Sequence, residues 1–216
     1  MKLKGAIFDM DGTLLDSMPV WYEIGSEVLK QKGLTPAMNL NEIIKPMTTL
    51  ESAQYLKKEY QMNESVNEII DDFNKLLERH YNESIPLKPG VEKFLRRLKE
   101  KNIKMCVATA TDIHLTKIAL KRLDIIDYFE DIITCNQVGM GKNNPEFFLK
   151  ALKLVNTPIS ETVVFEDALY AIKSAKEAGF PVAGVHDPSA YDEAKEIKDT
   201  VDWYLNSYDE WEMDQS

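Results

Sequence analysis

The chain has 216 residues, of which 44% are hydrophobic, and its formal net charge is −10 at pH 7. This length allows one sizeable core with a small inserted unit, and the apolar content without low-complexity tracts predicts a folded protein. The negative charge would repel nucleic-acid phosphates and anionic lipid, since no cluster of Lys or Arg offsets it locally. We therefore expect neither nucleic acid nor membrane as a partner, and a small anionic substrate would need a local cation.

Two further features bear on where the protein acts. No apolar run is long enough to span a membrane, and Met1 to Gly5 leads straight into a short apolar strand signal, unlike a signal peptide. Cys106 and Cys135 both lie in apolar segments, which is typical of buried thiols in a reducing compartment. We therefore expect a cytoplasmic protein.

Five short apolar runs predict buried strands. They span residues 6–8, 103–109, 132–135, 162–165 and 181–185. Apolar residues recur at helical spacing before the second run and between the later ones, as in residues 91–98. Strands that alternate with helices predict an α/β fold, with a Rossmann-like parallel sheet that helices cover on both faces.

The segment from Met18 to about Ser84 breaks this alternation, because it shows helical periodicity without a strand signal. Pro19 and the Pro-rich residues 85–90 bracket it, and such joints are typical of linkers or hinges. We predict an α/β core domain of residues 1–16 and 88–216. A helical cap domain, residues 17–87, is inserted into it after the first strand.

Acidic residues follow two of the predicted strands. Asp9 and Asp11 come after the first run, and Glu166 and Asp167 come after the fourth. Ligands of open parallel sheets bind beyond the carboxyl ends of the strands, so we expect these side chains to converge. Carboxylates that lie so close together repel one another unless a cation neutralises them. An oxygen-only ligand set suits Mg²⁺. The sequence therefore predicts a magnesium site.

The local cation that an anionic substrate would need is Lys142, which lies between the third and fourth predicted strands. A lysine there can neutralise a transferring phosphoryl group, while Thr109 and the backbone N–H of Ala110 donate to its oxygens. Thr111 and Asp112 follow, and we interpret them as capping residues of the next helix.

Residues 9–13, Asp-Met-Asp-Gly-Thr, resemble the first motif of the haloacid dehalogenase-like hydrolase superfamily. Thr109, Lys142 and the pair Glu166–Asp167 are similar to its other motifs, in the same order. The resemblance covers the whole chain, because the β-phosphoglucomutase-like branch of this superfamily also has a small helical cap inserted after the first strand.

The resemblance implies a magnesium-dependent phosphatase that acts on a small phosphorylated metabolite through an aspartyl phosphate. Asp9 would be the nucleophile, and Asp11 would protonate the leaving oxygen and then activate water, with its backbone carbonyl on Mg²⁺. Asp167 would complete the metal site, with Glu166 as a direct or outer partner. The phosphate-binding residues would be Asp9, Gly12, Thr109, Ala110 and Lys142, and Gly12 would also allow the turn that brings both aspartates inward.

Two alternatives stay open, a phosphosugar mutase of the β-phosphoglucomutase type and a non-enzymatic phosphate-binding module. Trp21 stands where the mutase members carry a cap histidine, and Thr49 where they carry an arginine. Both differences favour the phosphatase, since a mutase must bind a second phosphate. We expect a monomer, and the substrate is not readable from the sequence.

Overall fold

The computed structural model describes residues 2–45 and 47–211 of the chain. The chain forms two compact units, a core unit of Met1–Asp16 with Pro86–Ser216 and a helical unit of Ser17–Ile85. Pro86 and Leu87 belong to the core unit, because the Pro86 carbonyl accepts from Asp16 N at 3.0 Å and Leu87 forms a bridge with Leu15. The second boundary therefore lies before Pro86, whereas the sequence pattern places it after Leu87.

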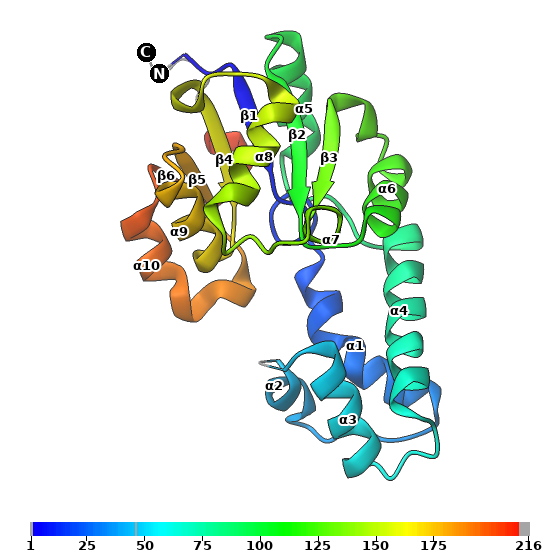
Figure 1. Cartoon of the computed structure of the whole chain (residues 1–216). Coiled ribbons are helices and arrows are strands. Elements are labelled where there is room, and N and C mark those ends of the chain that lie inside the picture. The colour runs from blue at the N-terminus through cyan, green and yellow to red at the C-terminus, as the bar shows by residue number, and fades with distance from the viewer. Residues whose placement is uncertain (1, 46, 212–216) are drawn as a thin grey trace. The chain divides into compact units, whose positions relative to one another are not determined.

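The core unit is built on a six-stranded sheet in the order β3-β2-β1-β4-β5-β6, and every pairing is parallel (Figure 1). The strands are β1 (Gly5–Phe8), β2 (Lys104–Thr109), β3 (Asp131–Thr134), β4 (Thr162–Glu166), β5 (Val182–Val185) and β6 (Trp203–Leu205). The first five match the predicted apolar runs closely, and the Rossmann-like parallel sheet is confirmed. The short edge strand β6 was not predicted, because Trp203 and Tyr204 are only partly buried and the run is too short to stand out.

Helices cover both faces of this sheet. They are α5 (Val91–Glu100), α6 (Ile113–Arg122), α7 (Cys135–Val138), α8 (Pro145–Val155), α9 (Leu169–Glu177) and α10 (Ala194–Thr200), with 3-10 helices η1 (Ile126–Tyr128), η2 (Ile159–Glu161), η3 (Pro188–Glu193) and η4 (Tyr208–Glu210). Ile7 and Val164 of the central strands pack in one cluster with Phe148 of α8. Phe8 and Phe165 point the other way, where both rings contact Phe94 of α5. Side chains alternate across a strand, so each central strand is buried on both faces.

The helical unit contains α1 (Met18–Gln31), α2 (Leu40–Ile44), α3 (Thr49–Glu59) and α4 (Val66–Glu83). Both α3 and α4 begin with a capping box, formed by Thr48 with Glu51 and by Ser65 with Glu68, which satisfies N–H groups that the first helical turn leaves unpaired. Helices α1 and α3 pack against α4. Across the described residues of both units, no helix is long and apolar enough to cross a membrane.

Strand β1 lies between β2 and β4, so the strand order reverses at this position. In open α/β sheets, ligands bind beyond the carboxyl ends of the strands at such a switch point. Asp9 directly follows β1, Thr109 ends β2 and Glu166 ends β4. The topology therefore brings the predicted site residues to one edge of the sheet.

Candidate active site

Lys142 bridges two carboxylates at this edge of the sheet. Its Nζ lies 2.6 Å from Asp9 Oδ1 and 2.6 Å from Glu166 Oε2. All three side chains are buried, and Asp9 is also held through its backbone N–H, which donates to the Phe165 carbonyl at 3.0 Å. A buried ammonium is tolerated when it is paired and hydrogen-bonded. The structure thus brings Lys142 to Asp9 from a loop far along the chain.

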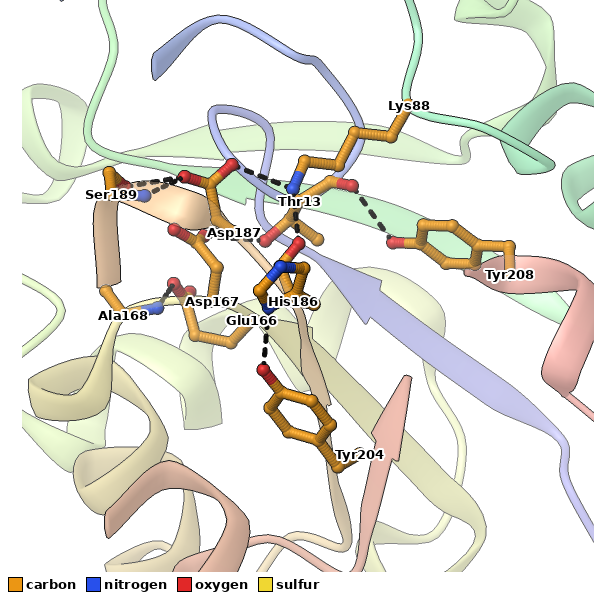
Figure 2. Close-up of polar contacts among 10 residues, drawn as sticks. All are labelled: Thr13, Lys88, Glu166, Asp167, Ala168, His186, Asp187, Ser189, Tyr204 and Tyr208. Carbon is orange, nitrogen blue, oxygen red and sulfur yellow. Dashed lines mark hydrogen bonds and ion pairs between the residues drawn. The ribbon is translucent and has the colours of Figure 1, made fainter. Parts of the chain in front are cut away.

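Asp9, Glu166 and Asp167 form a buried acidic cluster, in which one oxygen of each lies within 4.8 Å of the others. Thr13 Oγ1 donates to Asp167 Oδ1 at 2.8 Å, and the backbone N–H of Ala168 donates to Glu166 Oε1 at 3.1 Å (Figure 2). One lysine does not balance three ionised carboxylates, so the cluster has excess negative charge whenever all three are ionised. An oxygen-only donor set of this kind fits a hard divalent cation.

The charges in the cluster shift its pKa values. Burial, followed by the Glu166 charge, raises the pKa of Asp9 from 3.8 to about 6, although Lys142 opposes the shift. Burial and the charges of Glu166 and Asp9 raise the pKa of Asp167 well above its ordinary value. Burial would lower the pKa of Lys142, but the Asp9 and Glu166 carboxylates outweigh it and raise that pKa. The lysine therefore stays charged, while the Asp9 and Asp167 carboxyls resist ionisation.

Gly12 lets the turn after β1 pack closely against the acidic cluster. Its φ is +81°, in the left-handed region, and a Cβ at this position would lie 2.4 Å from Asp167 Oδ2. Its backbone N–H donates to the Leu15 carbonyl at 3.0 Å, and Leu14 N donates to the Met10 carbonyl at 2.9 Å. Gly12 thus contributes a tight turn and a close approach to Asp167, both of which a side chain would prevent.

Asp11 is the predicted carboxylate that lies outside the acidic cluster. Its Oδ2 accepts a hydrogen bond from Thr111 Oγ1 at 2.6 Å. Thr109 is buried, Ala110 is exposed, and Thr109 Oγ1 accepts from Thr111 N at 3.1 Å. The N-cap of α6 is Asp112, which accepts from His114 N at 2.8 Å. The interpretation of Thr111 as a capping residue is therefore wrong, because its hydroxyl binds Asp11.

A second buried ion pair lies beyond β5, where sequence reasoning did not place a site residue. Lys88 Nζ lies 2.8 Å from Asp187 Oδ2 and donates to the His186 carbonyl at 2.6 Å. Figure 2 shows this pair near Thr13 and Asp167, and the hydroxyl of the buried Tyr208 donates to the Thr13 carbonyl at 3.3 Å. The position of Asp187 just after a strand was the available signal, whereas Lys88 lies in a Pro-rich segment that suggested only a linker.

The chain is similar in sequence and in structure to known proteins. The chain is 30% identical to the phosphorylated carbohydrates phosphatase of Thermotoga maritima over 177 residues, which cover 82% of each chain. It is 27% identical to the beta-phosphoglucomutase of Bacillus subtilis over 85% of this chain and 83% of that one. A crystal structure of a Thermotoga maritima protein superposes with a TM-score of 0.84 and 29% identity, covering 97% of this chain and 96% of the other.

The family assignment follows from a match that spans most of the chain. Residues 6–185 match the sequence profile of the haloacid dehalogenase-like hydrolases. That range contains the acidic cluster, Lys142 and the whole helical unit. The resemblance inferred from the motifs is confirmed, and the chain belongs to the haloacid dehalogenase-like hydrolase family.

Proposed function

We propose that this protein is a magnesium-dependent phosphatase that hydrolyses a small phosphorylated metabolite through an aspartyl-phosphate intermediate. The observation that carries the proposal is the 2.6 Å contact of the Lys142 ammonium with Asp9 inside the buried acidic cluster. A carboxylate beside a fixed cation is suited to attack phosphorus, because the cation also offsets the charge of the incoming phosphoryl group. The phosphorylated carbohydrates phosphatase of Thermotoga maritima and the hexitol phosphatase A of Escherichia coli are relatives whose names support this class of substrate.

The reaction has two steps. In the first, a carboxylate oxygen of Asp9 forms a bond to phosphorus while the bond to the leaving oxygen breaks, and that oxygen takes a proton from Asp11. In the second, Asp11 removes a proton from a water molecule that attacks the phosphorus, which restores the Asp9 carboxylate and releases inorganic phosphate. One acid–base group is enough for both steps, because the proton that Asp11 gives in the first step is recovered in the second.

The phosphoryl oxygens need donors during both steps. Lys142 stays charged in its buried position and would neutralise one of them. Thr109 Oγ1 accepts from Thr111 N, so the Thr109 hydroxyl proton remains to be donated. The backbone N–H of Ala110, which directly follows Thr109, would provide a second donor.

Asp9, Asp167 and the backbone carbonyl of Asp11 would hold the magnesium ion. Glu166 already binds Lys142 through Oε2 and Ala168 N through Oε1. We therefore propose that it supports the metal ligands from outside and does not bind the metal itself. When bound, the cation supplies Lewis-acid stabilisation of the charge on the phosphoryl oxygens.

We propose that the helical unit is the cap that selects the substrate. Trp21, which stands at the position of the mutase histidine, donates through Nε1 to the Tyr81 hydroxyl at 3.1 Å within this unit. An indole N–H is a donor only and cannot take up a proton as a histidine would. This favours hydrolysis over phosphosugar transfer. The monomeric state and the cytoplasmic location stay predictions.

The test is phosphate release from a panel of phosphorylated metabolites, with and without Mg²⁺. We expect Mg²⁺-dependent release by the native chain and a loss of at least about 1,000-fold in Asp9→Asn. Asp131→Asn changes the same charge at the start of β3, the opposite edge of the sheet, and should retain activity. If the native chain released no phosphate from any substrate of the panel, the proposed phosphatase activity would be refuted. Full activity of Asp9→Asn would refute the proposal that Asp9 is the nucleophile. Isomerisation of a sugar phosphate without phosphate release would indicate a mutase.

A further inference from the structure

Thr111 directs its hydroxyl at Asp11, which lies 100 positions away in the sequence. The distance from Thr111 Oγ1 to Asp11 Oδ2 is 2.6 Å, which is typical of a hydroxyl that donates to a charged carboxylate. Asp11 lies outside the acidic cluster of Asp9, Glu166 and Asp167. Thr111 therefore contacts the carboxylate that has the acid–base role in the proposed function, and not the cluster that would hold the metal.

The loop that carries Thr111 is held on both sides. Before it, Thr109 Oγ1 accepts from the backbone N–H of Thr111 at 3.1 Å. After it, Asp112 caps α6, and Thr116 Oγ1 donates to the Asp112 carbonyl at 2.9 Å. Because these contacts fix the backbone on both sides of Thr111, its hydroxyl is a preorganised donor.

We propose that Thr111 is a positioning residue that holds the Asp11 carboxyl in the orientation in which it gives up and takes back the proton. The inference rests on the proposed function. Thr111 donates to Oδ2, which can accept this bond in both protonation states of the carboxyl. The Asp11 carboxyl gives its proton to the leaving oxygen as the bond from phosphorus to that oxygen breaks. In the second step, the carboxylate takes a proton from the water whose oxygen bonds to phosphorus as the Asp9–phosphate bond breaks.

The leaving group of the substrate separates this role from a general structural one. An alkyl phosphate needs a proton on its leaving oxygen, whereas 2,4-dinitrophenyl phosphate releases a stable anion without one. The test compares kcat/KM of the native chain and Thr111→Val on 2,4-dinitrophenyl phosphate and on the alkyl phosphate that the native chain hydrolyses fastest. This parameter reports the steps up to departure of the leaving group.

We expect Thr111→Val to lower kcat/KM at least about 10-fold on the alkyl phosphate and less than about twofold on the dinitrophenyl ester. The kcat on the dinitrophenyl ester should also fall, because the second step still needs Asp11 to activate water. Thr111→Ser keeps the hydroxyl and should stay within about twofold of the native chain on both substrates.

Thr116→Val is the matched control, because it removes a hydroxyl that binds the same loop but does not touch Asp11. Any change in kcat/KM that Thr116→Val causes should be of the same size on both substrates. Equal losses of kcat/KM on both substrates in Thr111→Val would overturn the inference in favour of a purely structural role. Native values of kcat/KM on both substrates would overturn it as well. Absence of any turnover by the native chain would instead refute the proposed function, and the inference with it.

Discussion

The Thr13 hydroxyl donates to Asp167 Oδ1 at 2.8 Å across 154 positions of sequence. This bond ties the turn after β1 to the loop after β4, and the Tyr208 hydroxyl holds the same turn through the Thr13 carbonyl. Both loops follow neighbouring parallel strands that run in register, with Phe8 opposite Phe165. The position of the carboxylates is therefore set by strand pairing, and changes in the turn should affect metal binding and stability together.

The stability of the metal-free protein should fall as the pH rises from about 4 to about 6, because the pKa of Asp9 is raised from 3.8 to about 6. The folded protein keeps a proton on Asp9 in this window, whereas the unfolded chain has lost it. The contribution is complete below the unfolded pKa and is lost as the pH passes the folded one. Calorimetry in EDTA should show the Tm of the native chain falling relative to that of Asp9→Asn. A Tm difference that stays constant between about pH 4 and pH 6 would contradict the raised pKa of Asp9.

Magnesium should stabilise the protein more at neutral pH than at about pH 5, because it binds the ionised carboxylates. At about 100 times Kd a ligand adds about 2.7 kcal/mol, which corresponds to roughly 5–10 °C in Tm for a chain of this size. Thermal scans with Mg²⁺ and with EDTA measure the difference. A Tm that Mg²⁺ leaves unchanged at neutral pH would count against a metal site in the acidic cluster.

Gly12→Ala should lower the free energy of unfolding by more than the roughly 1–2 kcal/mol cost of a left-handed backbone. The added Cβ would lie 2.4 Å from Asp167 Oδ2, so we also expect weaker Mg²⁺ binding. The matched control is Gly179→Ala, which has φ +94° but meets only Ile159 Cδ1, at 3.7 Å. Urea unfolding and Mg²⁺ titration would be done on both. Equal losses in the two variants would show that the contact with Asp167 is unimportant.

Lys142→Met should destabilise the protein by about 3–5 kcal/mol at about pH 8, because it leaves the buried Asp9 and Glu166 without their cation. At about pH 5 the loss should be smaller, since Asp9, whose pKa is raised to about 6, is then protonated and the repulsion is relieved. Lys104→Met breaks an exposed pair with Glu130 and should cost at most about 1 kcal/mol. Urea unfolding at both pH values tests this. A loss of equal size at each pH would indicate altered packing instead of unpaired charge.

Lys88→Met should also cost about 3–5 kcal/mol, because Asp187 would remain buried without its partner. The double variant Lys88→Met with Asp187→Asn removes both charges and should recover part of this loss, and Lys93→Met, which breaks an exposed pair with Asp209, is the control. Unfolding free energies of these variants and of Asp187→Asn alone give the coupling energy of the pair. A double variant whose loss equals the sum of the single ones would show no coupling.

The apolar runs of the sequence were enough to predict the parallel sheet and its inserted helical unit. Burial on both faces demands continuous apolar strands, and this pattern is local, so it is visible without coordinates. The same reasoning predicted which chain segments would meet, because Asp9, Thr109 and Glu166 each stand at the carboxyl end of a strand. Lys142 was predicted from its place between strands.

Tertiary structure alone decided which side chains touch. The pattern around Thr111 is that of a helix start, and only the packing of the loop after β2 against the turn after β1 turns its hydroxyl to Asp11. Likewise, Lys88 and Asp187 pair across 99 positions because separate loops end at the same edge of the sheet. Periodicity records which face of an element is buried. It does not record the partner of a polar side chain, which depends on distances between segments far apart in the chain.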